Sequence, residues 1–354
     1  MINQTKNGFM PDIAIPPGET LQEYLDSLDM TQVDLAKRTG LTPKTINEII
    51  KGKAPITPET ALKLESVFVT PASFWNNLES DYQETRARLQ AEKDIDDEVK
   101  IAKLISYPEL ARRGFVHPTT KAKEKVVYLR QFFGVASLEY IPDVLDVAFR
   151  KHDKEKSSHY ALAAWIRMGE LLAGKVITQD FNEKKLKETI PTFRELTLHE
   201  GDNFMPQLTE LCATLGVALV IVPHLPRTYA HGATKWLHPG KAMLQLSTRY
   251  QYADIFWFSF FHELGHILLH SKKNVFIETG EKSEEEVEAD RFASDCLIPG
   301  SKYRSFISKN RFTRDSINQF ANEISIDAGI VVGRLQHDKI IPWGNYKDMQ
   351  TKLV

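Results

Sequence analysis

The sequence predicts a mainly helical protein with a small β-sheet, an α+β fold. Helix start signals recur through residues 18–76, and a β-branched run with a hairpin pattern precedes two strong helical segments after residue 208. The chain has 354 residues, which is too long for one ordinary hydrophobic core. We therefore predict three regions, which are residues 1–80, 81–200 and 201–354.

The first 200 residues are predicted to be helical. Thr42 and Thr57 each stand before a proline, so each pair supplies a helix cap and a favoured first helical residue. The charged stretch Glu79–Lys103 is typical of a solvent-facing helix that links two regions. In the middle region, Val126–Phe133 and Tyr160–Leu172 have helical periodicity, and we expect them to serve packing or partner contact.

After residue 208 the pattern changes to alternating strands and helices. The run Gly216–Val222 is β-branched and predicts a strand. Two further strands are predicted to form a hairpin around Pro239-Gly240, because proline and glycine favour a turn there. The predicted hairpin strands and the helical segments that follow them are Ala230–Leu237, Ala242–Ser247, Asp254–His270, Glu284–Leu297 and, as two short helices, Arg314–Gln336.

Composition excludes several classes of protein. The net charge is −2, so the overall charge indicates neither a nucleic-acid nor a membrane partner. The chain has two cysteines, Cys212 and Cys296, which excludes a disulfide framework and favours a reducing compartment. No signal peptide and no run long enough to span a bilayer is visible, so we expect a cytoplasmic protein.

The segment His262-Glu263-Leu264-Gly265-His266 carries the clearest chemical signal. A helix repeats every 3.6 residues, so the two histidines lie one turn apart and can reach one metal ion. Glu263, beside the first of them, can take a proton from metal-bound water. Aromatic and aliphatic residues flank the motif, so the helix is expected to be buried, where histidine and glutamate need a partner. We predict that the partner is Zn²⁺.

The third zinc ligand is expected from the segment Glu284–Leu297. Its candidates are Glu285, Glu286, Glu288 and Asp290. We prefer Glu286, because Asp290 is then one turn further on the same face and can accept a hydrogen bond from the non-ligating nitrogen of a zinc-bound histidine. Glu288 points away from Glu286 by about 200° and is expected to face solvent or a neighbouring loop.

Two other interpretations of the motif stay open. One is a salt-bridged His–Glu pair without metal, and the other is a zinc site kept for structure or sensing without catalysis. His270, one turn beyond His266, is expected to be a structural or rim histidine. A zinc hydrolase also needs a donor for the developing oxyanion, and His231 or Tyr229 could fill that role, with a plain loop position as the alternative.

The stretch Thr31–Lys51 has the spacing of a helix–turn–helix. If Gln32 is the first position, Ala36 is the fifth, where a close helix crossing needs a small side chain. Gly40 is then the ninth, in the turn, where a left-handed backbone is useful. The residues expected to contact base edges or phosphates are Gln32, Thr42, Lys44, Thr45, Asn47 and Lys51.

Charge supports DNA binding less strongly than spacing does. Residues 1–65 hold seven Lys and Arg against nine Asp and Glu, a net charge of −2, which is unusual for a lone DNA-binding domain. A protein-interaction module of the same fold therefore stays open as the alternative. One recognition helix makes few contacts, so DNA binding is expected to need a dimer.

Two stretches resemble known families. Residues 15–80, with PPGETLQEYLDSLDMTQVDLAKRTGLTPKTINEIIKGKAPITPETALKLESVF, resemble HigA-type antitoxins of the XRE helix–turn–helix class. Residues 208–300, with FWFSFFHELGHILLH and EVEADRFASDCLIP, resemble the ImmA/IrrE family of zinc metallopeptidases. The two resemblances imply an N-terminal helix–turn–helix domain of five-helix type, a helical middle region and a C-terminal zincin-like metallopeptidase domain.

The resemblances also imply a function and a ligand set. The family's zinc ligands fall on His262, His266 and Glu286, and Asp290 stands where asparagine is frequent. Such a protein is expected to bind operator or promoter DNA and to cleave a specific repressor-like protein with its zinc endopeptidase domain. The alternative is a HigA-type antitoxin or transcription regulator, with a cognate toxin or repressor as partner, whose zinc domain binds or senses without proteolysis. Neither implies a membrane partner.

Overall fold

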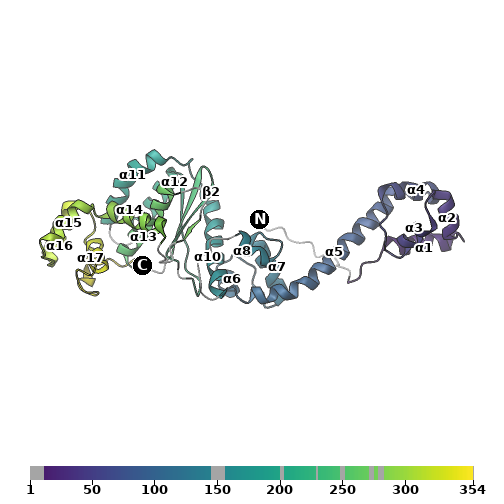
Figure 1. The fold of residues 1–354 in the computed structure, drawn as a ribbon, viewed down its shortest axis with the longest axis horizontal. Coiled ribbons are helices and arrows are strands. Elements are labelled where there is room, and N and C mark those ends of the chain that lie inside the picture. The colour runs from purple at the N-terminus through teal and green to yellow at the C-terminus, as the bar shows by residue number, and fades with distance from the viewer. Residues whose placement is uncertain are drawn as a thin grey trace. The chain divides into compact units, whose positions relative to one another are not determined.

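The computed structural model describes residues 12–144, 156–199, 203–228, 230–247, 252–270, 275–277 and 283–353 (Figure 1). Helices dominate the described chain, and four described strands form one sheet, so the predicted α+β class is confirmed. The chain divides into two compact units, residues 1–97 and residues 98–354. The three regions expected from the sequence stay a prediction.

The first unit is a group of short helices followed by the start of a long one. These helices are α1 (Pro17–Ser27), α2 (Gln32–Thr39), α3 (Pro43–Ile50), α4 (Pro58–Phe68) and α5 (Ala72–Ala102). Thr31, Thr42 and Thr57 cap α2, α3 and α4, because each side-chain oxygen accepts a hydrogen bond from the backbone N–H three residues later. The helix starts predicted at Thr42 and Thr57 are therefore confirmed.

The turn between α2 and α3 has the geometry that the spacing predicts. Ala36 is buried on α2, and Gly40 ends that helix with a φ of +71°, in the left-handed region. A Cβ on Gly18 of α1 would lie 2.1 Å from the carbonyl oxygen of Ile49, so glycine is needed where α1 crosses α3. The predicted helix–turn–helix is confirmed.

The second unit contains the remaining helices. They are α6 (Tyr107–Arg112), α7 (Ala122–Phe133), η1 (Leu138–Tyr140), α8 (Ile141–Val144), α10 (Lys156–Lys175), α11 (Glu183–Glu195), η2 (Leu196–Leu198), α12 (Met205–Thr214), α13 (Ala253–Leu269), α14 (Glu284–Leu297), α15 (Gly300–Ser308), α16 (Arg314–Ile324), α17 (Ala328–His337) and η3 (Lys347–Met349). The helices predicted within residues 126–133, 160–172, 254–270, 284–297 and 314–336 are confirmed.

A four-stranded sheet lies at the centre of the second unit. Its strands are β1 (Val217–Ile221), β2 (Gly232–His238), β3 (Lys241–Leu246) and β4 (Phe276–Ile277), in the order β1-β3-β2-β4. β2 and β3 form the predicted hairpin, and β1, also predicted, runs parallel to β3. β4 pairs with β2 in antiparallel register and was not predicted, because two residues are too short for a periodic signal.

Helices cover both faces of this sheet. Gln245 of β3 donates a hydrogen bond to the carbonyl oxygen of Trp165, so this side chain faces α10. Its neighbours Leu244 and Leu246 belong to the hydrophobic cluster around Phe260 of α13. Because successive side chains of a strand point to opposite faces, α10 and α13 lie on opposite sides of the sheet. The helix α13 is therefore buried, as the sequence predicts.

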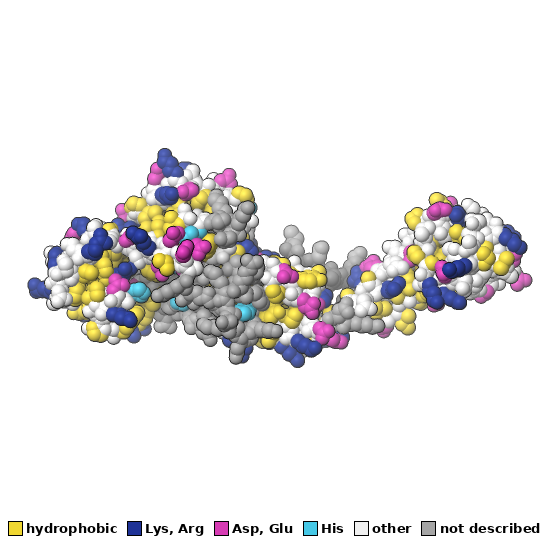
Figure 2. Space-filling model, viewed as in Figure 1, with side chains coloured by type: hydrophobic (Ala, Val, Ile, Leu, Met, Phe, Trp, Pro, Cys, Tyr) yellow, Lys and Arg dark blue, Asp and Glu magenta, His cyan; other side chains and the backbone are white. Residues whose placement is uncertain are grey.

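Charged side chains are interspersed over the visible face of the described chain (Figure 2). Both signs occur within each unit, in agreement with the net charge of −2. Among the described helices, none is long and apolar enough to span a membrane.

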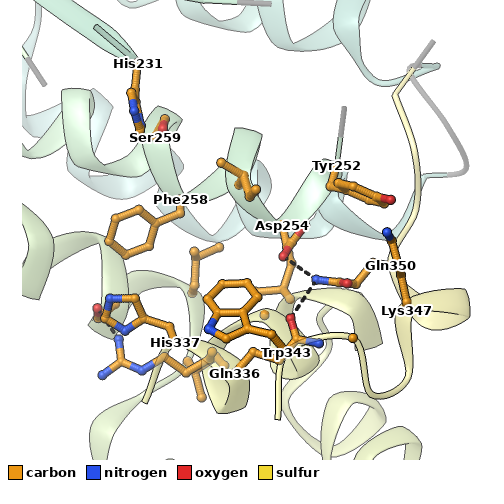
Figure 3. Close-up of a pocket in the computed structure, with 18 residues that line it drawn as sticks. His231, Tyr252, Asp254, Phe258, Ser259, Gln336, His337, Trp343, Lys347 and Gln350 are labelled. Carbon is orange, nitrogen blue, oxygen red and sulfur yellow. Dashed lines mark hydrogen bonds between the residues drawn. The ribbon is translucent and has the colours of Figure 1, made fainter. Parts of the chain in front are cut away.

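The second unit also contains a cavity of about 690 Å³. It lies between α13, α14, α17 and the segment 343–350, and His231 and Ser259 are at one end of it (Figure 3). Its apolar lining is formed by Ile255, Phe258, Leu297, Ile298, Ile330 and Trp343. The volume is that of a pocket which can bury most of a small ligand.

Candidate metal centre

The helix α13 presents His262 and His266 from one face, one turn apart. Both side chains are almost fully buried. The ring of His266 stacks on Phe276 of β4, with ring centroids 4.4 Å apart and an interplanar angle of 14°. His266 is thus fixed between the body of α13 and the strand β4.

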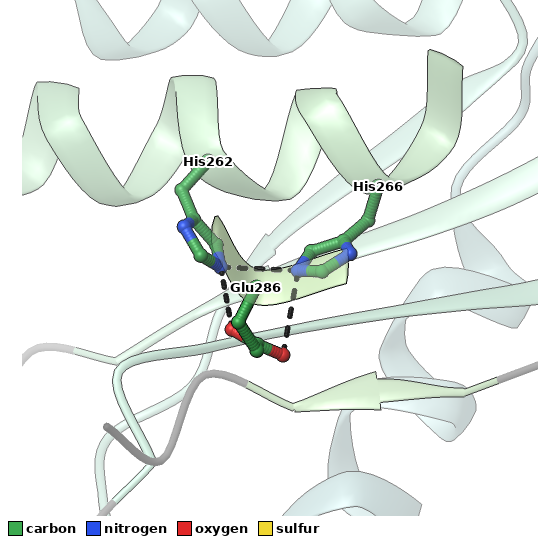
Figure 4. A group of neighbouring side chains, drawn as sticks. All are labelled: His262, His266 and Glu286. Atoms are coloured by element: carbon green, nitrogen blue, oxygen red, sulfur yellow. Dashed lines mark hydrogen bonds and ion pairs between the residues drawn. The ribbon is translucent and has the colours of Figure 1, made fainter. Parts of the chain in front are cut away.

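The helix α14 brings Glu286 to the same point (Figure 4). The Ser283 side chain caps this helix by accepting a hydrogen bond from the backbone N–H of Glu286. The Nε2 atoms of His262 and His266 lie 3.0 Å apart, and the Glu286 carboxylate oxygens lie 3.1 Å from Nε2 of His262 and 3.7 Å from Nε2 of His266. Among the described residues, these three form the group that could hold a metal ion.

The three side chains fit a zinc ion. Two imidazoles and a carboxylate are the ligands of many catalytic zinc sites, and tetrahedral bonds of about 2.0–2.1 Å place neighbouring ligand atoms about 3.3 Å apart. The distances of 3.0, 3.1 and 3.7 Å between the two Nε2 atoms and the carboxylate oxygens scatter around that value. Oε1 of Glu286 is buried and has no hydrogen-bond partner among the described residues, an arrangement that a metal ion would satisfy.

The ionisation of the site also suits a cation. Burial raises the pKa of Glu286, but the interactions with His262 and His266 outweigh burial and bring the pKa to about 2. Burial lowers the pKa of His266, against the opposing effect of Glu286. The carboxylate is therefore ionised and the His266 ring is neutral near pH 7, and these are the forms that bind metal.

Both histidines are also held at the ring nitrogen that faces away from the centre. Nδ1 of His262 lies 2.9 Å from Oδ1 of Asp290, as expected from the sequence. Nδ1 of His266 lies 2.9 Å from Nδ1 of His270, and Nε2 of His270 lies 3.2 Å from Oε2 of Glu288. If each Nδ1–H of the two central histidines donates outward, both Nε2 lone pairs point to the centre.

Glu288 and His270 make contacts that the sequence did not show. Glu288 is exposed, as expected, but its carboxylate contacts His270 rather than only solvent or a loop. His270 connects this carboxylate to His266, so it has a specific contact with the proposed ligand set. Periodicity could not show this contact, because it depends on how the end of α13 meets α14.

Glu263 follows His262 on α13, and residues of the strand β2 hold its carboxylate. Its side chain is fully buried, and Thr234 donates a hydrogen bond of 2.6 Å to its Oε2. A Cβ on Gly232 would lie 2.3 Å from Oε1 of Glu263, so this glycine leaves room for the carboxylate. Thr234 and Gly232 were missed in the sequence, because a strand pattern does not show which helix its side chains meet.

The residues expected to donate to an oxyanion have different outcomes. Tyr229 lies outside the described residues. His231 precedes β2 and lies beside Ser259 at the end of the cavity (Figure 3). Its assignment as an oxyanion donor stays a prediction.

The residues expected to contact DNA gather on α3 and its flanks. Lys44 and Lys51 are exposed, and Lys44 lies 3.9 Å from Glu48 in an exposed ion pair. The hydroxyl groups of Thr42 and Thr45 lie 2.8 Å apart, and Gln32 contacts Gln22 on α1. Gln32, Thr45 and Asn47 are half-buried, and Thr42 is exposed. Their contacts with DNA stay a prediction.

Comparison with known families assigns both ends of the chain. The helix–turn–helix family model matches residues 21–75, and the model of the IrrE N-terminal-like domain, a peptidase family, matches residues 224–335. A helix–turn–helix-type transcriptional regulator of Escherichia coli K12, YddM, is 34% identical over 80 residues, which are 23% of this chain and 81% of that protein. Virulence-associated protein I of Dichelobacter nodosus is 40% identical over 70 residues, 20% of this chain and 65% of that protein.

Solved structures also resemble the N-terminal part. An addiction module antidote protein of the HigA family from Coxiella burnetii is 36% identical, covering 24% of this chain and 92% of its own, with a TM-score of 0.23. The Pseudomonas aeruginosa antitoxin HigA, solved with the higBA promoter, is 32% identical, covering 24% of this chain and 94% of its own, with a TM-score of 0.23.

Proposed function

Because the chain belongs to the helix–turn–helix regulators of the XRE type and carries an IrrE N-terminal-like domain, we propose that it is a DNA-binding regulator with a zinc-dependent endopeptidase. Its substrate is a specific regulatory protein of the repressor kind. The observation that carries this proposal is the convergence of His262, His266 and Glu286, with the buried Glu263 next to His262 on the same helix.

The chemistry follows from the side chains around this point. A zinc ion held by His262, His266 and Glu286 would supply Lewis acidity to a peptide carbonyl and to water. Glu263 takes the proton of the attacking water and returns it to the leaving amine, as a general base and then a general acid. Thr234 and Gly232 keep its carboxylate in one orientation for both transfers. His231 is proposed to donate a hydrogen bond to the developing oxyanion.

Metal content and cleavage test the proposal in two steps. Elemental analysis of the purified full chain should find one zinc ion for each chain, and finding none would refute the proposal. Glu263→Gln should keep the zinc and abolish cleavage of a repressor-like substrate protein that the wild type cleaves. Glu284→Gln, which changes an exposed glutamate at the start of α14, is the matched control and should cleave normally.

The N-terminal unit is proposed to bind the promoter as a dimer. Lys44 and Lys51 would contact phosphates, and Asn47 with Thr45 would contact base edges. A gel shift with the DNA upstream of the gene should show a specific complex at physiological salt, which weakens steeply as salt is raised. Asn47→Ala should lower the preference for this DNA over unrelated DNA.

One observation favours a second candidate, a HigA-type antitoxin or regulator whose zinc domain binds or senses without proteolysis. Glu263 has no exposed surface in this conformation, whereas a general base must reach its water and substrate. In this case Glu263→Gln would leave regulation unchanged, while Lys44→Glu would weaken promoter binding. Comparing the two variants in one promoter-reporter assay separates the candidates.

A further inference from the structure

The helices α13 and α14 pack against each other in antiparallel orientation. We call their line of contact the seam, and the metal centre lies on it. His266 meets Glu286 and His262 meets Asp290, so a step of four residues along one helix matches a step of four back along the other. Gly265 packs on Ala289 between these pairs, where a Cβ on the glycine would lie 3.3 Å from the Ala289 Cα. The close approach fixes this register.

The same register continues into the cavity. If the pairing of residues is continued beyond His262 and Asp290, Phe258 is opposite Ser294. One turn further, Ile255 is opposite Leu297. All four of these residues line the cavity of about 690 Å³. The cavity therefore occupies the next two turns of the seam that holds the proposed ligands, and it belongs to the same side of both helices.

The distance from the metal centre to the cavity, measured along α13, can be compared with the length of an extended peptide. Ser259 lies three residues before His262, about 4.5 Å along the axis, and Ile255 lies seven residues before it, about 10 Å. An extended peptide advances about 3.3 Å per residue. Side chains one to three residues from a bond held at the metal centre would therefore reach the cavity.

The lining defines what those side chains should be. Ile255, Phe258, Leu297, Ile298 and Ile330 give the cavity an apolar wall, and Trp343 adds an indole that is 72% exposed. Burial of apolar surface is the main contribution that such a wall can make to binding. A polar or charged side chain would lose its hydration there without gaining a matching partner on most sides.

One polar group of the cavity also points to a peptide. Asp254 lines the cavity, and its Oδ2 accepts a hydrogen bond of 2.8 Å from Gln350. Its Oδ1 is buried and has no hydrogen-bond partner among the described residues. A backbone N–H of a bound peptide is a donor of the right kind for this oxygen.

We propose that this cavity is the specificity pocket of the peptidase and binds large aliphatic or aromatic side chains of the substrate, one to three residues from the cleaved bond. The proposal rests on the proposed zinc endopeptidase and adds the substrate class to it. The substrate is then a protein that offers an extended, apolar segment at its cleavage site.

The test uses peptide hydroxamates, which bind zinc through the hydroxamate and present one side chain to a neighbouring pocket. Two matched pairs are needed, because the cavity can lie on either side of the cleaved bond. One pair consists of succinyl hydroxamates with an isobutyl or a methyl side chain, and the other of N-acetyl-alanyl-leucine and N-acetyl-alanyl-alanine hydroxamates. Binding to the zinc-loaded full chain is measured by calorimetry.

In one of the two pairs, the compound with the isobutyl side chain should bind about 10- to 60-fold more tightly than the compound with the methyl side chain. The reason is that each buried CH₂ contributes roughly fourfold to affinity. Ile255→Trp should fill the cavity and remove the difference, and Trp343→Ala, at an exposed position, should reduce it. Ile177→Trp is the matched control, since Ile177 is 92% exposed and does not line the cavity.

The outcomes separate this proposal from the function on which it rests. A chain that binds no zinc refutes the zinc peptidase and the pocket together. Zinc binding with equal affinity for both members of each pair refutes the pocket alone. A preference that persists unchanged in both Ile255→Trp and Trp343→Ala also refutes it, because the side chain would then bind elsewhere.

Discussion

Replacing His270 by leucine should weaken zinc binding although His270 is not a proposed ligand. The Nδ1 of His266 lies 2.9 Å from His270, and the His266 side chain has no exposed surface. Water cannot easily replace the lost acceptor, so the Nδ1–H would remain unsatisfied whenever Nε2 faces the metal. Loss of such an outer contact typically weakens metal affinity 10- to 100-fold, or about 1.4–2.7 kcal/mol.

The contact between Glu288 and His270 allows a graded series. Glu288→Gln keeps an oxygen that can accept from Nε2 of His270, so zinc affinity should fall by less than about threefold. His224→Leu is the matched control for His270→Leu, because His224 is exposed and is not part of the metal-binding group. Its zinc affinity should equal that of the wild type.

Competition with a chromogenic zinc chelator at constant pH measures these affinities. Circular dichroism of each variant shows whether its fold is preserved. If His270→Leu keeps its fold and binds zinc as tightly as the wild type, the hydrogen bond from His266 does not orient the ligand. The reasoning from the outer contacts would then be wrong, even if zinc itself is bound.

Three further changes have expected outcomes. Gly232→Ala should displace the Glu263 carboxylate, which would lie 2.3 Å from the new Cβ, so cleavage should fall at least tenfold while zinc content, measured by elemental analysis, is retained. Glu98→Ala should lower the free energy of unfolding in urea by about 3 kcal/mol, because the ion pair between Arg130 and this buried carboxylate is lost. Burial raises the pKa of Glu98, but hydrogen bonds from Arg130 and Leu138 outweigh burial and hold the pKa below 4.5. The stability that the ionised carboxylate contributes is therefore present above pH 4.5 and is lost as the pH falls further. Lys44→Glu should weaken promoter binding and reduce the slope of affinity against salt, whereas a specific complex unchanged in a gel shift would exclude Lys44 from the interface.

Much of the local structure could be predicted from the sequence because it depends on neighbouring residues. The Thr-Pro pairs at the starts of α3 and α4 predict helix caps, and the Pro239-Gly240 pair predicts the hairpin turn. The spacing of Ala36 and Gly40 predicts the helix–turn–helix. Each of these signals acts over fewer than ten residues, so no knowledge of the tertiary structure is needed.

For the candidate site too, the local features could be predicted from the sequence, and the contacts between helices could not. The sequence by itself determined that His262 and His266 share one face of a helix with Glu263 beside them, because helical periodicity is a local property. It left several acidic residues of α14 as candidates for the third position. Only the tertiary structure brought Glu286 to the two histidines and Glu288 to His270, because the register of α13 against α14 decides which carboxylate reaches which ring.

The remaining features also depended on contacts between distant segments. The strand β4 is too short to have a pattern, and it forms because β2 offers it an edge. Thr234 meets Glu263 across 29 residues, and the cavity is lined by the segment 343–350, which begins 90 residues after the start of α13. The sequence thus determined which chemical groups the chain carries and how each helix presents them. The tertiary structure decided which groups meet, because packing joins residues whose separation along the chain has no period.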